Sequence, residues 1–244
     1  MTTMRKTALV AGALYLITFI TSIPALPLYH DILHNRTYIL NGGRDTAVLW
    51  GAFLEIICAL AGIGTAVTLF PVVKRQSETA ALAFVTARVL EAGMIFVGVL
   101  SVLSIVTLHK GGASGADAAS LVSTGRSLVA LHDWTFLLGP GLMPAVNAVC
   151  LGYVMYRARL VPRIIPMLGL IGAPLLFAAF VAILTGQFDQ VSPPSAIAAL
   201  PIAAWEFSLG VWLVVKGFKP SPITSNVTRP QFRDIESALT PAHA

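Results

Sequence analysis

Residues 79–108 read TAALAFVTARVLEAGMIFVGVLSVLSIVTL, an apolar run interrupted by two full charges, Arg88 and Glu91. A helix needs about 20 apolar residues to cross a hydrocarbon core roughly 30 Å thick. The run exceeds that length, which predicts a transmembrane helix that is tilted or extends past the bilayer. Because a charge at bilayer depth costs about a few kcal/mol or more, the two charged residues need an explanation of their own.

The composition of the whole chain also indicates a membrane protein. Of its 244 residues, 56% are hydrophobic and 11% are charged, whereas soluble domains carry roughly a quarter charged residues. Too few polar residues are present to coat a soluble fold of this size. The net charge is +5, but no basic patch is interleaved with aromatic residues, so nucleic acid is not an expected partner. Cys58 and Cys150 lie in apolar runs without metal-type spacing, which predicts free thiols.

Six apolar runs are long enough to span a bilayer. The sequence therefore predicts an all-α polytopic membrane protein, a six-transmembrane-helix bundle with spans at about 7–28, 47–73, 79–108, 128–156, 163–185 and 196–217. We expect one membrane domain, 1–218, followed by a mostly disordered cytoplasmic tail, 219–244, which is rich in Pro, Ser and Thr. Residues 29–46 and 109–127 are the expected longer outer loops, the second containing the flexible segment KGGASGADAAS.

Basic residues alternate between the two sides of the predicted bundle. Eleven Lys or Arg fall on the side of the termini: Arg5, Lys6, Lys74, Arg75, Arg157, Arg159, Arg163, Lys216, Lys219, Arg229 and Arg233. Four fall on the other side: Arg36, Arg44, Lys110 and Arg126. Cytoplasmic loops carry the excess of positive charge, so both termini are expected in the cytoplasm of a multi-pass plasma-membrane protein.

Ionisable residues inside the predicted spans mark a candidate ligand or proton site. They are Glu55, Arg88, Glu91 and Glu206, with His132 and Asp133 near the outer start of the fourth span. Glu55 and Glu206 each lie on a stripe of small residues at helical spacing, and such stripes are helix-contact faces. Arg88 is three residues from Glu91, at a depth from which it can bridge Glu91 to a second carboxylate. At least one glutamate is then left without an arginine, and we expect it to be protonated, to bind a cation or to hydrogen-bond to water.

Structural interpretations of the same residues stay open. Buried Arg and Glu can simply lock helices together, while Asn147, Pro140 and Pro144 add a polar contact and a kink to the fourth span. His132 and Asp133, followed by a tryptophan, are typical of a capped helix start at the membrane interface, or else line the entrance of a pocket.

Two histidines in the first outer loop can be interpreted either as a metal site or as part of a solvated loop. His30 and His34 are four residues apart, so on a helix they share a face that could hold a metal. The glutamate-centred zinc-peptidase pattern is missing, which favours a solvated interfacial loop.

Four longer phrases resemble a bacterial integral membrane family known as domain of unknown function 4386. They are GAFLEIICALAGIGTAVTLFPVVKRQ (51–76), ARVLEAG (87–93), YRARLVPRIIPMLGLIG (156–172) and AWEFSLGVWLVVKGF (204–218). The resemblance covers nearly all of the chain up to Phe218 and includes Glu55, Arg88, Glu91 and Glu206. It implies a six-span integral membrane protein, and it brings no activity, cofactor or catalytic residue with it.

Three functional hypotheses follow from these residues. The leading one is a polar site inside the bundle that binds or transports a small polar or amphipathic molecule, a lipid included, or relays protons. The second is an intramembrane enzyme in which the glutamates, His132 and Asp133 hold a metal, although the Glu-x-x-His pairing of carboxylate-rich bundles is missing. The third is an accessory or scaffold subunit. The sequence leaves the cofactor unknown, and the expected partners are the lipid bilayer and, under the leading hypothesis, a small-molecule or lipid ligand.

Overall fold

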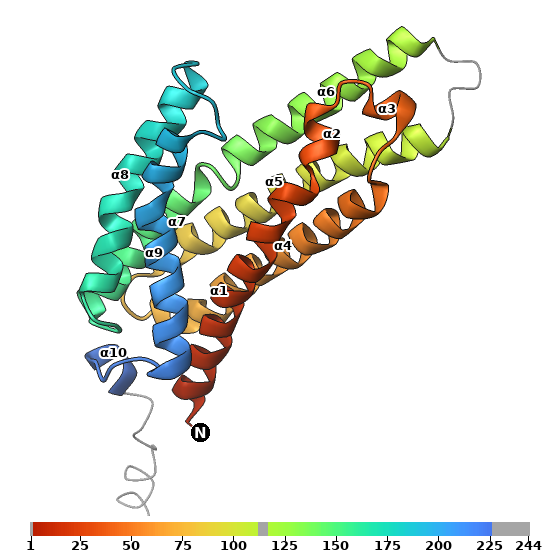
Figure 1. The fold of residues 1–244 in the computed structure, drawn as a ribbon. Coiled ribbons are helices and arrows are strands. Elements are labelled where there is room, and N and C mark those ends of the chain that lie inside the picture. Colours follow the sequence, from red (N-terminus) through yellow and green to blue (C-terminus); the bar gives the residue numbers. More distant parts are fainter. Residues whose placement is uncertain (1, 112–116, 226–244) are drawn as a thin grey trace, which may run out of the picture.

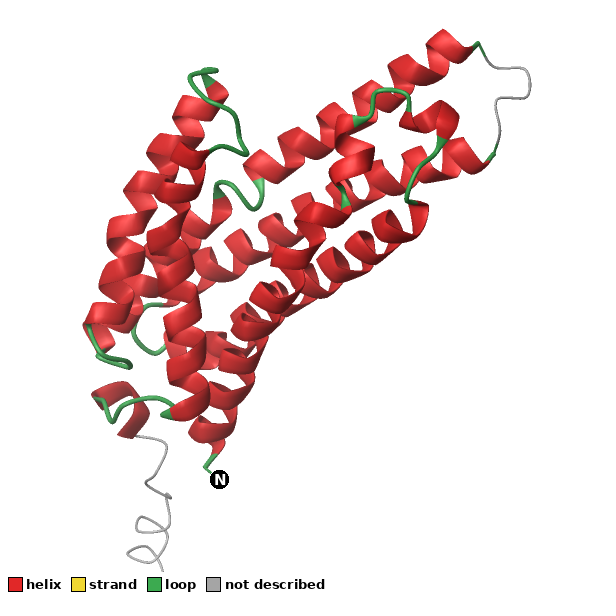
Figure 2. Ribbon diagram, in the orientation of Figure 1, coloured by secondary structure: helices red, strands yellow, loops and turns green. Residues whose placement is uncertain are grey.

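The computed structural model describes residues 2–111 and 117–225, and every element within them is a helix (Figure 1). Loops and turns join the helices, with no strand in the described ranges (Figure 2). The helices are α1 (Thr3–Leu28), α2 (His30–His34), α3 (Tyr38–Asn41), α4 (Asp45–Val73), α5 (Glu78–Lys110), α6 (Ala118–Leu138), α7 (Met143–Ala158), α8 (Ile164–Leu184), α9 (Pro193–Val215) and α10 (Pro222–Ser225). The expected tail falls mainly on residues 226–244, which lie outside the described residues.

Six segments are long and apolar enough to cross a membrane, which confirms the predicted all-α fold class of a multi-pass membrane protein. α1, α4, α5, α8 and α9 each supply one such segment, and α6 with α7 supplies the sixth. The chain is interrupted between α6 and α7 at Gly139–Leu142. Pro140 has no N–H to donate to a helix, and Pro144 lies at the start of α7, so the predicted kink is a full break.

The outer loops were predicted too long. α5 continues to Lys110 and α6 begins at Ala118, ten residues before the expected span start at Leu128. The start of α6 is fixed by Asp117, whose side chain accepts a hydrogen bond from the backbone N–H of Ala119. Polar residues in the first turns of α6 hid this extension from an apolar-run criterion, since they lack the hydropathy of a span. Residues 112–116 of the expected flexible segment lie outside the described residues.

Residues 29–46 fold into a small cap instead of an open loop. α2 and α3 place Ile32, Tyr38 and Ile39 in a buried cluster with side chains of α4 and α5. The Tyr38 hydroxyl donates to Asp45 at 2.7 Å, and burial together with this hydrogen bond raises the pKa of Tyr38 above its ordinary value. The cap therefore gives the end of the bundle opposite the N-terminus a structure of its own (Figure 1).

The long helices form a closed ring. α1 packs on α4 and α9, α4 on α5, α5 on α7, α7 on α8, and α8 on α9, while α6 lies against the C-terminal part of α5 (Figure 1). Small residues allow the closest approaches, as where Gly169 of α8 faces the ring of Trp205 on α9. The largest buried cluster fills the part of the ring nearest the N-terminus.

The crossing of α1 and α9 positions the functional site. A Cβ added at Gly12 would lie 2.7 Å from the carbonyl oxygen of Gly210, so the two backbones touch there. Toward the N-terminus of α1, the guanidinium of Arg5 donates to the carbonyls of Leu213 and Val214 at 2.9 and 2.6 Å, at the end of α9 where carbonyls lack helical partners. Beyond this clamp the helices diverge toward the cap (Figure 1).

Candidate functional site

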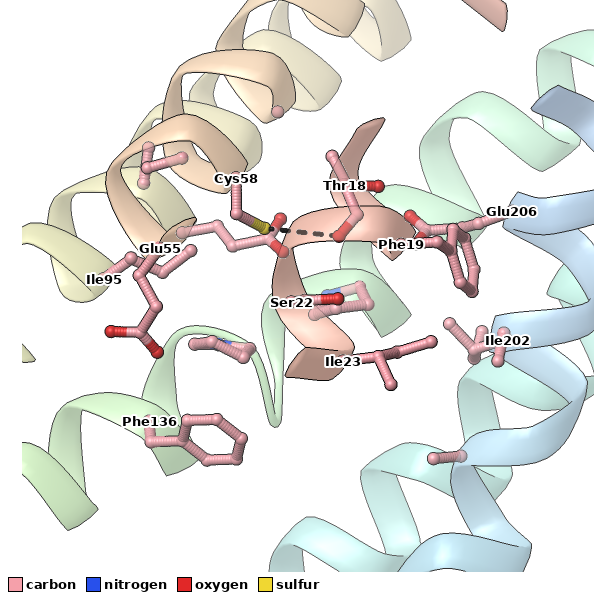
Figure 3. A pocket seen from close by; sticks show the side chains of 18 of the residues that line it. Thr18, Phe19, Ser22, Ile23, Glu55, Cys58, Ile95, Phe136, Ile202 and Glu206 are labelled. Atoms are coloured by element: carbon pink, nitrogen blue, oxygen red, sulfur yellow. Dashed lines mark hydrogen bonds between the residues drawn. The ribbon is translucent and has the colours of Figure 1, made fainter. Parts of the chain in front are cut away.

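A cavity of about 280 Å³ occupies the space between the diverging helices. α1, α4, α5 and α9 supply most of its wall, and the break between α6 and α7 supplies Phe136, Pro140 and Pro144 (Figure 3). Gly62 of α4 is buried, yet a Cβ added there would meet no heavy atom within 4 Å. Most residues of the wall are apolar, and open space adjoins the wall at Gly62.

Arg88 forms ion pairs with two of the other three charged residues predicted for the site. Its guanidinium pairs with Glu91 at 3.0 Å on the same helix and with Glu206 of α9. Its side chain is 4% exposed, and it lies over the ring of Tyr15 with 5.3 Å from Cζ to the ring centroid. A buried cation is tolerable here because two carboxylates and an aromatic face surround it.

The network extends to a third helix through Glu91. Asn147 of α7 donates from Nδ2 to the same Glu91 oxygen that Arg88 contacts, at 2.8 Å. Two buried polar atoms of this cluster, Nε of Arg88 and Oδ1 of Asn147, have no hydrogen-bond partner among the described residues. Each such atom has unused capacity to bind water or a ligand, because leaving it unpaired costs free energy.

Glu55 is the carboxylate that Arg88 does not reach. It forms no ion pair with a lysine or arginine of residues 2–111 and 117–225, and its carboxylate accepts a hydrogen bond from the hydroxyl of Tyr29 at 3.0 Å. Glu55 and Glu206 come from α4 and α9 and lie on opposite sides of the cavity (Figure 3). The cavity wall therefore holds three carboxyl groups and one guanidinium, with the guanidinium already engaged by two of them.

The expectation that His132 and Asp133 mark a capped helix start is wrong, because they lie in the last two turns of α6. His132 is buried, and its ring meets the ring of Tyr29 edge-on with centroids 5.6 Å apart. Asp133 is exposed and turns away from the main cavity, with its Oδ1 3.4 Å from Nδ1 of His132. The early start of α6, ten residues before the predicted span, accounts for this correction.

A second, much smaller cavity of about 10 Å³ lies behind Glu55. Glu55 and His132 both line it, together with Thr135 and Gly98. The structure thus brings His132 next to Glu55 and leaves Asp133 outside both cavities.

Sequence reasoning missed several residues of the site. Tyr29 directly follows the predicted first span and gave no signal, because its partner Glu55 is 26 residues away. Tyr15 follows Ala8, Ala11 and Gly12 at helical spacing, so the small-residue pattern used for the glutamates could have found it. Thr18, Ser22 and Cys58 line the cavity but carry no pattern of their own.

The described residues supply no set of ligands for the metal of the second hypothesis. Within the described ranges, no group of three or more His, Cys, Asp or Glu side chains is arranged to hold a metal ion. His30 and His34 are exposed and their rings stack at 4.4 Å between centroids, with Nδ1 of His34 contacting the carbonyl of His30.

Comparison with known proteins places this architecture in a family. No curated protein and no solved structure matches the chain. The family described as "Domain of unknown function (DUF4386)" matches residues 10–217, a range that contains the six ionisable residues singled out in the spans. This range also covers nearly all of the six candidate spans, which confirms the resemblance carried by the four sequence phrases. The chain belongs to this family, as a multi-span membrane protein with a buried Arg88–Glu206 pair.

Proposed function

We propose that the protein binds a small amphipathic cation in the central cavity and carries it across the membrane. One observation carries the proposal: the cavity wall has three carboxyl groups and one guanidinium, and that guanidinium is engaged by Glu91 and Glu206. Glu55 then provides an acidic group with no basic partner among the described residues. A ligand with a positive charge would complement it, because an ionisable group at this depth is costly without a counter-charge.

The remaining wall favours an apolar body on the ligand. Phe19, Ile23, Leu26 and Ile95 line the same cavity as Glu55. Ile23 and Leu26 are also exposed on the outer face of α1, at 62% and 52%. The cavity therefore adjoins the lipid side of the bundle where α1 and α9 diverge, and an amphipathic molecule could enter there directly from the bilayer.

The proposal includes an orientation in the plasma membrane. Eleven basic residues on the side of the termini, against four on the other, support cytoplasmic termini. In that orientation the cavity extends from the middle of the bilayer into its outer half, since Thr18 to Leu26 form the outer half of α1 and Glu206 lies near the middle of α9. Carriage to the other side would require the α1–α9 clamp at Arg5 and Gly12 to loosen.

A binding measurement tests the proposal. The probe is 2-phenylethylammonium, with 2-phenylethanol as its neutral analogue and 3-phenylpropionate as its anionic one, titrated against protein in lipid nanodiscs. We expect binding of the ammonium compound alone, and loss of that binding in Glu55→Gln. Glu78→Gln is the matched control, because Glu78 is exposed at the start of α5 and lies outside the cavity. Equal binding of all three probes would contradict a cation site.

A structural role is the second candidate, and a separate observation favours it for Arg88. Arg88 ties α5 to α9 directly and, through Glu91, to Asn147 of α7. Such a cluster fixes helix pairing whatever the ligand is. The two roles divide between residues, with Arg88 holding the helices and Glu55 meeting the ligand. A Glu55→Gln variant that folds normally but loses binding would separate them.

A further inference from the structure

We infer that Glu55 exchanges protons with the outer aqueous side through His132 and Asp133, so that a proton and the cation compete for the same carboxylate. The inference rests on the proposed function, which it deepens from binding to proton–cation exchange. It is carried by neighbouring groups that lead from the central cavity to a pocket at the outer end of the bundle: Glu55 and His132 line one small cavity, His132 contacts Asp133, and Asp133 lines the outer pocket.

The first link joins Glu55 to His132 through a cavity that both side chains line. Both side chains line the small cavity of about 10 Å³, and roughly 10–15 Å³ measured this way holds one water molecule. The Tyr29 hydroxyl, 3.0 Å from Glu55, and the Tyr29 ring, 5.6 Å from the His132 ring, keep both groups in place around it. A water there would have two polar partners that can each give or take a proton.

The second contact joins His132 to Asp133. Nδ1 of the imidazole lies 3.4 Å from Oδ1 of Asp133, which leaves Nε2 for exchange with the water. Imidazole can accept a proton on one ring nitrogen and release another from its second nitrogen, which makes histidine a proton shuttle. His132 itself is 6% exposed, so the shuttle is shielded from bulk water.

The third contact opens to the outside. Asp133 is 58% exposed and lines an outer pocket of about 260 Å³ between α6 and the cap. Arg36 and Arg126 lie in the same pocket and form no ion pair with any described residue. Asp133 therefore connects the shielded imidazole to a pocket that faces the aqueous side.

The charged and titratable groups around the route are few. Glu55 of α4 faces Tyr29 at the end of α1 and His132 of α6, and across the cavity it faces the Arg88 cluster of α5 and α9. His132 faces Tyr29, Asp133 and Glu55. The Arg88 cluster is internally paired, so Glu55 is the acidic group on the wall that is free to exchange.

The exchange balances without any other reactant. When the cation arrives, the O–H bond of protonated Glu55 breaks and its proton passes through the water to Nε2 of His132. The imidazole then releases its Nδ1 proton to Asp133 and on to bulk water, while the carboxylate forms an ion pair with the cation. One proton leaves for each cation bound, and the reverse sequence restores the starting state.

The test is the rate of proton release, because removing a relay changes the speed of exchange and leaves its equilibrium in place. Protein in nanodiscs is mixed with 2-phenylethylammonium in a stopped-flow instrument, and pyranine reports the released protons. We expect one proton per cation in the wild type and none in Glu55→Gln. In His132→Ala we expect release slowed by roughly 100-fold, which is the lower end of what a positioned acid–base group contributes. Added imidazole should restore the rate, which a purely structural role for His132 would not allow.

Asp133→Asn provides the variant that keeps the fold, because the side chain is exposed and similar in shape. It should also slow release while leaving equilibrium binding of the probe within about twofold of wild type. Unchanged release rates in both variants would overturn the route even if binding is intact. If the wild type binds no probe, the proposed function fails instead. In that case the route is tested without a ligand, by the rate at which the carboxyl band of Glu55 exchanges with deuterium in infrared difference spectra. Equal exchange rates in the wild type and in His132→Ala would overturn the route.

Discussion

Arg88 of α5 and Glu206 of α9 form an ion pair inside the bundle although 118 residues separate them in sequence. Arg88 is the arginine of the cavity wall, and its guanidinium also pairs with Glu91. Glu55 thereby becomes the acidic group available to a ligand. The chemistry proposed for the cavity depends on this division of the charges.

Arg88 is expected to be the most sensitive residue for stability. In Arg88→Met, Glu91 and Glu206 lose their buried counter-charge, which should lower the free energy of unfolding by about 3–5 kcal/mol. Unfolding in bicelles by steric trapping measures this change. The triple variant Arg88→Met, Glu91→Gln, Glu206→Gln removes all three charges and should recover most of the loss. A single variant as stable as the wild type would show that the pair does not hold α5 to α9.

The contact of α1 with α9 should tolerate no side chain at Gly12. Gly12→Ala would place a methyl group 2.7 Å from the Gly210 carbonyl oxygen and 2.8 Å from the Val214 nitrogen. Because backbone atoms cannot move aside cheaply, we expect a loss of about 1–3 kcal/mol. Gly93→Ala is the control, since nothing lies within 4 Å of its added Cβ, and it should be neutral or stabilising by up to about 1 kcal/mol. Equal melting temperatures for the two variants would contradict a close crossing.

Much of the fold follows from the sequence, because span length and apolar composition are local properties. The six spans were predicted on that basis, and the kink in the fourth span was predicted from Pro140 and Pro144. The extension of α6 and the folded cap were not, because their helices are polar on one side and are stabilised by packing of Ile32, Tyr38 and Ile39. A search for long apolar runs does not detect tertiary contacts of this kind.

The charged members of the candidate site were predictable, but its uncharged residues and its geometry were not. The cost of burying a charge singles out Glu55, Arg88, Glu91 and Glu206 from the sequence alone. Which glutamate Arg88 leaves unpaired depends on the order of helices around the ring, and helical spacing within one span carries no such information. The cavity itself is a space between the diverging halves of α1 and α9, so no single residue encodes it.

Filling the cavity should abolish binding without unfolding the protein. Gly62→Leu would place an isobutyl group in the open space beside α4, where an added Cβ meets nothing within 4 Å. We expect affinity for 2-phenylethylammonium to fall by about tenfold or more, a free-energy change of about 1.4 kcal/mol. Gly62→Ala serves as the control because its single methyl leaves most of the 280 Å³ open. If the leucine variant binds normally at unchanged stability, the ligand does not occupy this cavity.

Cys58 offers a chemical report on the sign of the cavity's charge. Its thiol lines the cavity, while Cys150 does not. In a Cys150→Ser background, positively charged 2-aminoethyl methanethiosulfonate should modify Cys58 faster than the negatively charged 2-sulfonatoethyl reagent, because the wall is acidic. The probe cation should protect the thiol, as read by mass spectrometry. Faster reaction with the anionic reagent would contradict an acidic cavity.

The central claim is that Glu55 is the anchor for a cationic ligand, and equilibrium binding of radiolabelled 2-phenylethylammonium to Glu55→Gln tests it most directly. Gln keeps the shape of the side chain and can still accept a hydrogen bond from Tyr29, so loss of charge is the main change. The account predicts that Glu55→Gln loses binding while Glu78→Gln retains it. Binding of equal affinity in both variants would contradict it.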